Sequence, residues 1–274
     1  MSEAGTRSRS AAAIDAAAAE GRAALVGYLP VGFPDVAGSA DAVQAMVDGG
    51  VDVVELGLPY SDPLMDGPVI QHAVDTALRA GTRTRDVLGV VEKAAAGGTP
   101  VLVMTYWNPV DRYGVERFAA DLASAGGAGL ITPDLIPDEG ADWIAASDAH
   151  ELERVFLVAP SSTPQRLAST AAACRGWVYA ASTMGVTGIR ATVGDGAAGL
   201  VRRTRDAGAG RVCVGLGVST REQAAEVAGY ADGVIVGTAF VRALADTPDP
   251  AAGLRAVRAL AEALATGVRE GRRR

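Results

Sequence analysis

Glu55 is a charged residue near the end of a mainly apolar run, Val51–Gly57. Burying a carboxylate is costly unless the group gains a partner or takes up a proton. An apolar setting therefore predicts a raised pKa for Glu55, which suits a general acid–base. The alternative is a structural glutamate whose oxygens are satisfied by hydrogen bonds.

Asp66 lies in the segment that follows this run, 58–68, which three prolines stiffen. Asp66-Gly67-Pro68 favours a turn, and Pro68 suits the first turn of a helix. Taken alone, Asp66 is most simply a helix cap. Together with Glu55, it offers a second carboxylate for acid–base chemistry on a small substrate.

Glycines follow the last three apolar runs of the chain, in 182–188, 215–219 and 236–240. Backbone N–H groups in glycine loops and at helix N-termini bind phosphate. The chain has a single lysine, Lys93, in a helical stretch, which argues against imine chemistry and favours a phosphate site built from backbone. The alternative is that these glycines only allow tight turns.

Eight short apolar runs alternate with helical stretches, and this pattern must position the carboxylates and glycines. Continuous apolar runs predict strands buried on both faces, as in parallel sheets. We expect an α/β fold, a (β/α)8 TIM barrel, with chemistry at the carboxyl ends of its strands. An open doubly wound sheet is the alternative, although segment 29–34 lacks its glycine fingerprint. The runs are Ala24–Pro30, Val51–Gly57, Pro100–Trp107, Ala128–Thr132, Arg154–Ala159, Gly176–Ala181, Arg211–Gly215 and Asp232–Gly237.

The rest of the chain predicts a single domain spanning 1–274, with an extra N-terminal helix in 1–20 that covers the barrel bottom and a tail in 266–274. The longest gaps follow the second and sixth runs, where binding loops are expected. Helices are expected at Ser39–Val47, Gly114–Ala125, Pro164–Cys174 and Thr220–Ala228, with N-caps at Ser39, Thr163 and Ser219 or Thr220.

Composition excludes several classes of protein. With 274 residues, 49% hydrophobic residues and a net charge of −7, the chain lacks the cationic surface that nucleic acid requires. The sequence contains no run of about eighteen apolar residues, so it predicts no membrane span. Two cysteines fit a reducing cytoplasm, and two histidines far apart predict no metal site.

Residues 55–68, ELGLPYSDPLMDGP, closely resemble the signature of tryptophan synthase α subunits. The similarity extends over nearly the whole chain and is weak in 1–20 and after about residue 265. It implies retro-aldol cleavage of indole-3-glycerol phosphate to indole and glyceraldehyde 3-phosphate, without a metal or organic cofactor. By the same resemblance, Glu55 is the general acid–base, and Asp66 holds the indole N–H.

The resemblance also implies the substrate contacts. Residues matching the wall around the indole or the closing loop are Tyr28, Ile70, Leu157 and Thr187, and Tyr179 matches a substrate-binding residue beside the catalytic Glu. Residues matching the phosphate site are Gly188, Gly217, Gly237 and Thr238. Some positions depart from the family pattern, namely Met65, Thr183, Thr238 and 134–137, and none of these removes a catalytic group.

The family works as an αββα complex in which the β subunit carries pyridoxal phosphate and joins indole to serine. Asp62, Pro63 and Asn108 match positions that touch β. Three rivals remain: a stand-alone lyase that releases free indole, a non-catalytic regulatory subunit, and an unrelated sugar-phosphate isomerase barrel.

Overall fold

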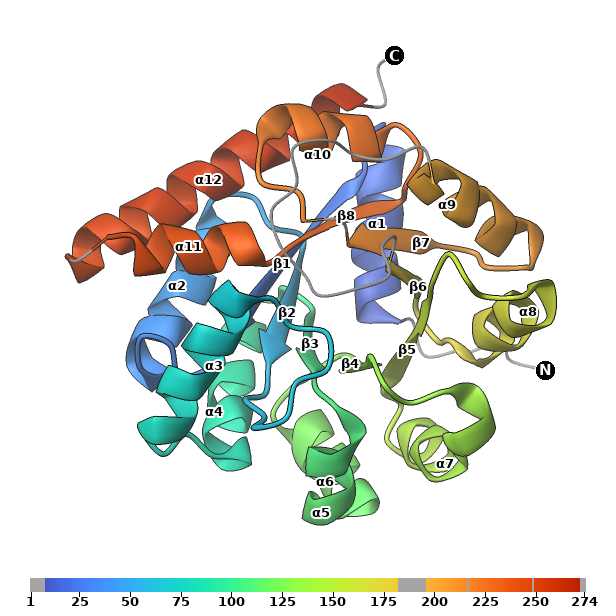
Figure 1. Ribbon diagram of the computed structural model, residues 1–274, viewed down its shortest axis with the longest axis horizontal. Coiled ribbons are helices and arrows are strands. Elements are labelled where there is room, and N and C mark those ends of the chain that lie inside the picture. Colours follow the sequence, from blue (N-terminus) through green and yellow to red (C-terminus); the bar gives the residue numbers. More distant parts are fainter. Residues whose placement is uncertain (1–7, 182–195, 216, 248, 272–274) are drawn as a thin grey trace.

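The computed structural model describes residues 8–181, 196–215, 217–247 and 249–271. Its eight strands are parallel, follow one another in chain order and close into a barrel, because β1 pairs with both β2 and β8 (Figure 1). The barrel prediction is confirmed, and the open-sheet alternative is wrong. The strands are β1 (Ala24–Pro30), β2 (Val53–Gly57), β3 (Val101–Met104), β4 (Gly129–Thr132), β5 (Glu153–Val158), β6 (Val178–Ala181), β7 (Val212–Gly215) and β8 (Gly233–Val236).

Helices surround the barrel and supply its outer layer (Figure 1). The long gap after β2 holds a loop and two helices, α3 and α4, whereas most of the gap after β6 lies outside the described residues. The helices are α1 (Arg9–Ala19), α2 (Val36–Asp48), α3 (Pro68–Arg79), α4 (Thr84–Ala95), α5 (Trp107–Tyr113), α6 (Val115–Ser124), the 3-10 helix η1 (Pro137–Glu139), α7 (Ala141–Ala149), α8 (Pro164–Ala173), α9 (Gly196–Asp206), α10 (Arg221–Ala228), α11 (Thr238–Ala245) and α12 (Pro250–Gly271).

The strands are apolar on both faces because each face packs against a different core. Val26, Val53 and Val155 belong to a cluster inside the barrel, the interior cluster. The alternate strand residues, such as Val54 and Leu130, pack outward against the helices. Each fully buried side chain of this size stabilises the fold by about 1.5–3 kcal/mol.

Two of the expected helix caps are confirmed and one is wrong. Thr163 and Thr220 cap α8 and α10 with their side-chain oxygens. Ser39 does not cap α2, because that helix begins earlier and its N-cap is Asp35. The Ser39 hydroxyl instead accepts the N–H of Gly32 at 3.1 Å and fastens the loop after β1 to the helix.

The N-terminal helix α1 closes one end of the barrel, as the sequence predicts. Ile14 and Ala17 of this helix belong to the interior cluster. Glu153 of β5 accepts the Ser10 N–H at 2.8 Å and the Ser10 hydroxyl, and the Trp177 indole N–H donates to the same hydroxyl at 3.1 Å. A buried carboxylate at a helix N-terminus is a favourable anchor, so α1 is fixed to the strands by hydrogen bonds and apolar contact.

The opposite end of the chain forms α12, which packs against α10 and α2. Residues 266–271, expected as a tail, continue this helix, and Val268 and Gly271 are buried in it. None of the helices in the described residues is long and apolar enough to cross a membrane.

Candidate active site

Glu55 lies in β2 between Tyr28 of β1 and Leu102 of β3. Val53 belongs to the interior cluster, so Glu55, two residues further along the strand, faces into the barrel as well. Its side chain is fully buried, and neither carboxylate oxygen has a hydrogen-bond partner in the described part of the chain. Within the described residues, Glu55 thus lacks the hydrogen bonds that the alternative of a structural glutamate requires. Burial raises the pKa of Glu55 to about 8, so the group is largely protonated at neutral pH.

Two tyrosines lie beside this carboxyl group, Tyr28, which is buried, and Tyr179, which is partly buried. Burial raises the pKa of Tyr28 and of Tyr179, and the charges of Glu55 and Asp66 raise both further, so both phenols keep their protons. Gly215 of β7 makes room for one of them, because a Cβ at that position would lie 2.4 Å from the Tyr179 phenol oxygen. The barrel mouth around Glu55 is thus built from tyrosine rings packed on glycines.

Asp66 lies in the loop between β2 and α3 and is half-buried. Burial raises its pKa to about 6, which leaves it mainly ionised at neutral pH. The simple helix-cap interpretation is wrong: Gly67 is the N-cap of α3, no side chain caps the helix, and Pro68 begins it as expected. Gln71 of α3 donates to the backbone carbonyl of Asp66 at 2.8 Å, which fixes the peptide behind the carboxylate.

A cavity at the carboxyl ends of the strands brings together Asp66 and Tyr28, both of which the resemblance places at the substrate. Ile70, expected in the wall, packs in the core between barrel and helices, and Val74, one turn further along α3, lines the cavity instead. Helical spacing alone leaves both positions open, because both lie on the buried face of α3. The cavity is lined by Tyr28, Leu58, Tyr60, Asp66, Val74, Met104, Thr105, Tyr106 and Pro133.

Leu157 of β5 lines a separate groove, together with Met65 of the Asp66 loop. Tyr28 and Leu157 thus line different grooves. Both grooves also contain Pro133, which follows β4 and links them.

The expected phosphate site is described in part. Gly217, after β7, has a φ of +70°, a conformation that favours glycine. Gly237 is the N-cap of α11, and Thr238, the first residue of this helix, is buried. No side chain of the N-cap residue accepts a hydrogen bond from the N-terminal N–H groups of α11. Thr187 and Gly188 lie outside the described residues, as does Thr183.

The residues expected at a partner interface lie at the rim of this face. Asp62 and Asn108 are exposed, and Pro63 is partly exposed. The Asn108 amide donates to the Tyr60 hydroxyl at 3.0 Å, which joins the loop after β2 to α5. The three positions are therefore accessible, two in the loop after β2 and one at the start of α5.

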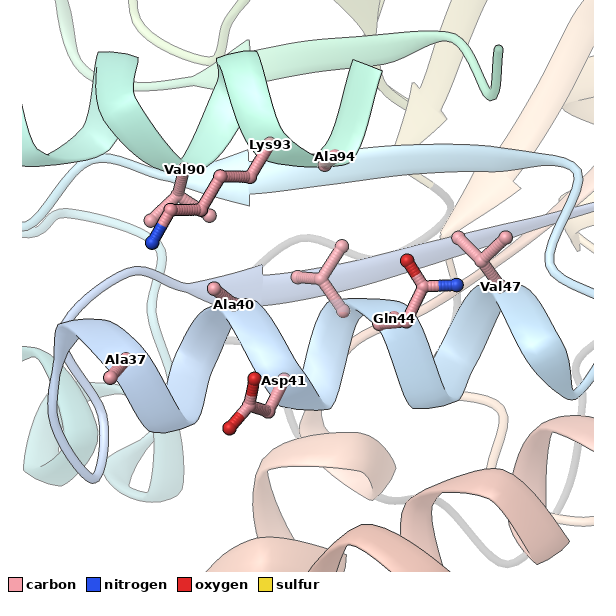
Figure 2. A pocket seen from close by; sticks show the side chains of 9 residues that line it. Ala37, Ala40, Asp41, Gln44, Val47, Val90, Lys93 and Ala94 are labelled. Atoms are coloured by element: carbon pink, nitrogen blue, oxygen red, sulfur yellow. The ribbon is translucent and has the colours of Figure 1, made fainter. Parts of the chain in front are cut away.

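A further groove lies away from these loops, on the outside of the barrel. Figure 2 shows it between α2 and α4, with Asp41 and Gln44 on one wall and Lys93 on the other. Lys93 lies in helix α4, as expected, and is exposed. It is therefore not at the carboxyl end of a strand. In the residues that the structure describes, no group of three His, Cys, Asp or Glu side chains could hold a metal ion.

These features define a class of protein. A closed parallel barrel with two carboxyl groups of raised pKa at the carboxyl ends of its strands is an enzyme of the (β/α)8 class. One group is protonated and one is mainly ionised at neutral pH, which is the arrangement that acid–base catalysis needs.

Comparisons with known proteins give the family. The family model for the tryptophan synthase alpha chain matches residues 14–269. The tryptophan synthase alpha chain of Thermobifida fusca is 62% identical over 261 residues, covering 94% of this chain and 96% of the relative. That of Streptomyces coelicolor is 63% identical over 255 residues, covering 93% and 94%.

Solved structures of tryptophan synthases share the fold of this chain. A structure of Mycobacterium tuberculosis tryptophan synthase has a TM-score of 0.90 at 57% identity, covering 95% of this chain and 98% of that one. A mutant tryptophan synthase alpha-subunit from Pyrococcus furiosus has a TM-score of 0.81 at 31% identity, covering 89% and 98%.

The chain belongs to the tryptophan synthase alpha chain family. It is a lyase subunit of tryptophan biosynthesis that cleaves indole-3-glycerol phosphate to indole and glyceraldehyde 3-phosphate. The isomerase rival is therefore wrong.

Proposed function

We propose that Glu55 and Asp66 together carry out the cleavage of indole-3-glycerol phosphate. The observation that carries this proposal is the state of Glu55: it is fully buried in the barrel, has no hydrogen-bond partner in the described residues and has a pKa of about 8. A carboxyl group that is protonated at neutral pH and surrounded by apolar residues is ready to donate a proton.

Glu55 acts twice in this scheme. It first gives its proton to indole C3, which converts the ring to an indolenine-like cation. The resulting carboxylate then accepts the proton of the glycerol hydroxyl next to the bond that breaks. As the C–C bond breaks, its electron pair returns to the ring and restores indole, and the hydroxyl-bearing carbon becomes the aldehyde of glyceraldehyde 3-phosphate. The reaction leaves Glu55 protonated again.

Asp66 stabilises the intermediate between these two proton transfers. Protonation at C3 places positive charge on the ring nitrogen, and a carboxylate that accepts the indole N–H hydrogen bond stabilises this charge. The pKa of about 6 keeps Asp66 mainly ionised at neutral pH. Its partial burial strengthens the attraction, because the interaction is less screened than in water.

The remaining substrate contacts divide between the indole end and the phosphate end of the substrate. Tyr28, Leu157, Tyr179 and Ile70 surround the indole, with Ile70 acting from the core behind the wall. The phosphate binds backbone N–H groups at Gly188, Gly217, Gly237 and Thr238, and Thr187 contributes from the loop after β6. The uncapped N-terminus of α11 supports this placement.

The partner in this proposal is a tryptophan synthase β subunit, in an αββα tetramer that acts in the cytoplasm. The chain uses no metal or organic cofactor of its own, since its carboxyl groups handle both protons, and pyridoxal phosphate belongs to β. Asp62 and Pro63 contact β from the loop after β2, and Asn108 does so from the start of α5. Docking there orders the loops and excludes water from the site.

Indole release from indole-3-glycerol phosphate tests the proposal. The purified chain is assayed alone and with a β subunit, beside Glu55→Gln and Asp66→Asn. We expect β to raise the rate and each substitution to lower it by several orders of magnitude. Equal rates with and without β would favour the stand-alone lyase, and full activity of either variant would refute that residue's role.

A further inference from the structure

Tyr106 is a buried tyrosine at the point where β3 ends and α5 begins, and it lines the same cavity as Asp66. Its phenol oxygen accepts the backbone N–H of Met65 at 2.9 Å. Met65 directly precedes Asp66. The hydrogen bond therefore fixes the peptide in front of the carboxylate, while the bond from Gln71 fixes the peptide behind it.

The ring of Tyr106 makes a second contact with the same loop. It packs against the ring of Tyr60, with centroids 5.4 Å apart and planes 38° apart. The Tyr60 hydroxyl in turn accepts the Asn108 amide. The Asp66 loop is thus joined to the start of α5 at both of its ends, by a hydrogen bond at Met65 and a tilted ring contact at Tyr60.

Tyr106 is itself held by the next loop along the barrel. The N–H of Trp107, the first residue of α5, donates to the two carboxylate oxygens of Asp134 at 2.9 and 3.2 Å. A carboxylate at a helix N-terminus is stabilising. The contact fixes the backbone next to Tyr106, so the loops after β2, β3 and β4 form one connected support.

The phenol is a neutral group in this setting. Burial raises the pKa of Tyr106 to about 12, against the opposing effect of the backbone hydrogen bonds from Met65 and Leu64. The oxygen therefore accepts the Met65 N–H and keeps its own proton. A phenylalanine would preserve the ring packing and remove only the acceptor.

We propose that Tyr106 is a positioning residue: its phenol oxygen holds the backbone at Met65 and thereby directs the Asp66 carboxylate toward the indole N–H. This inference rests on the proposed role of Asp66. Catalytic groups lose on the order of 100-fold in rate when displaced by about 1 Å. Asp66 lies in a loop and needs support of this kind more than Glu55 does. Glu55 lies in a strand that pairs with a neighbouring strand on each side.

The test is a double-mutant cycle on indole formation, with Tyr106→Phe, Asp66→Asn and the double variant measured with a β subunit present. We expect Tyr106→Phe to lower kcat by about 10- to 100-fold. The same substitution should have little further effect in the Asp66→Asn background, because its effect passes through Asp66. If Asp66→Asn has no measurable turnover, the cycle is read on the affinity for a phosphorylated indole that lacks the glycerol hydroxyls and is not cleaved.

Tyr113→Phe is the matched control. Tyr113 ends the same helix and donates to Asp121 at 2.6 Å, outside the cavity, so this variant should keep the kcat of the unsubstituted chain. Thermal unfolding of every variant separates loss of fold from loss of positioning.

Several outcomes would overturn the inference. Unchanged kcat in Tyr106→Phe, equal losses in both backgrounds, or an equal loss in Tyr113→Phe would each show that the phenol oxygen does not act through Asp66. Full activity of Asp66→Asn would instead refute the proposed function of that carboxylate, and so the two failures are distinguishable.

Discussion

Gly57, two residues after Glu55, leaves the space that the Tyr28 phenol occupies: a Cβ at position 57 would lie 2.4 Å from the Tyr28 hydroxyl oxygen. Tyr28 and Glu55 are register partners on neighbouring strands. The glycine therefore sets where the tyrosine ring lies beside the Glu55 carboxyl group. A strand glycine commonly marks such a close approach.

Substitution of Gly57 by alanine should displace the Tyr28 ring. We expect Gly57→Ala to destabilise the fold by about 1–3 kcal/mol, since overpacked cores lose free energy of this size. Activity should fall with it, because the ring moves beside Glu55. Urea unfolding and indole release measure the two effects. Gly89→Ala, in α4 with no atom near the added Cβ, should change neither activity nor packing; a loss as large in Gly89→Ala would contradict this explanation.

The stability of the fold should depend on pH through Glu55. Its pKa is raised from 4.5 to about 8 on folding, so the folded state favours the protonated form. The stabilisation is complete below about pH 4.5 and is lost as pH rises toward about 8, by up to about 1.4 kcal/mol per pH unit. Glu55→Gln should remove this dependence. Urea midpoints at pH 5, 7 and 8.5 would show the variant gaining on the parent as pH rises; parallel curves would exclude a raised pKa.

The rate should show a bell-shaped dependence on pH. Asp66, with a pKa of about 6, must be ionised, whereas Glu55, with a pKa of about 8, must begin protonated. We therefore expect kcat/KM to rise through about pH 6 and to fall above about pH 8. Asp66→Asn should lack the acidic limb in whatever activity it retains. A profile without either limb between pH 5 and 9 would contradict these assignments.

The bottom of the barrel should affect stability without affecting catalysis. Ser10→Ala removes a partner from the buried Glu153 carboxylate and from the Trp177 indole N–H. We expect a loss of about 1–3 kcal/mol, because buried polar groups are left unsatisfied. The rate of indole formation should not change, since the reaction takes place at the other end of the strands. The exposed Ser169→Ala should change stability by less than about 0.5 kcal/mol; an equal loss there, or a lower rate in Ser10→Ala, would refute this separation.

The sequence by itself determined the barrel and its two carboxylates. Buried parallel strands require continuous apolar runs, so the positions of β1 to β8 are visible in the chain. Glu55 stands out because it is the one charged residue of β2. The segment 58–68 carries a specific pattern whose three prolines restrict the local backbone. These are local signals, since they depend on neighbours in the chain.

Only the tertiary structure decided how the site is supported. Tyr106 reaches Met65 across 41 positions of sequence, and Glu153 reaches Ser10 across 143. The prediction that Ser39 caps α2 was wrong for the same reason. Asp35 and Ser39 are both residue types that suit a helix N-cap, but in the folded chain Asp35 is the cap and Ser39 hydrogen-bonds to Gly32. Such contacts form only when the barrel closes and brings distant loops together, so no local pattern specifies them.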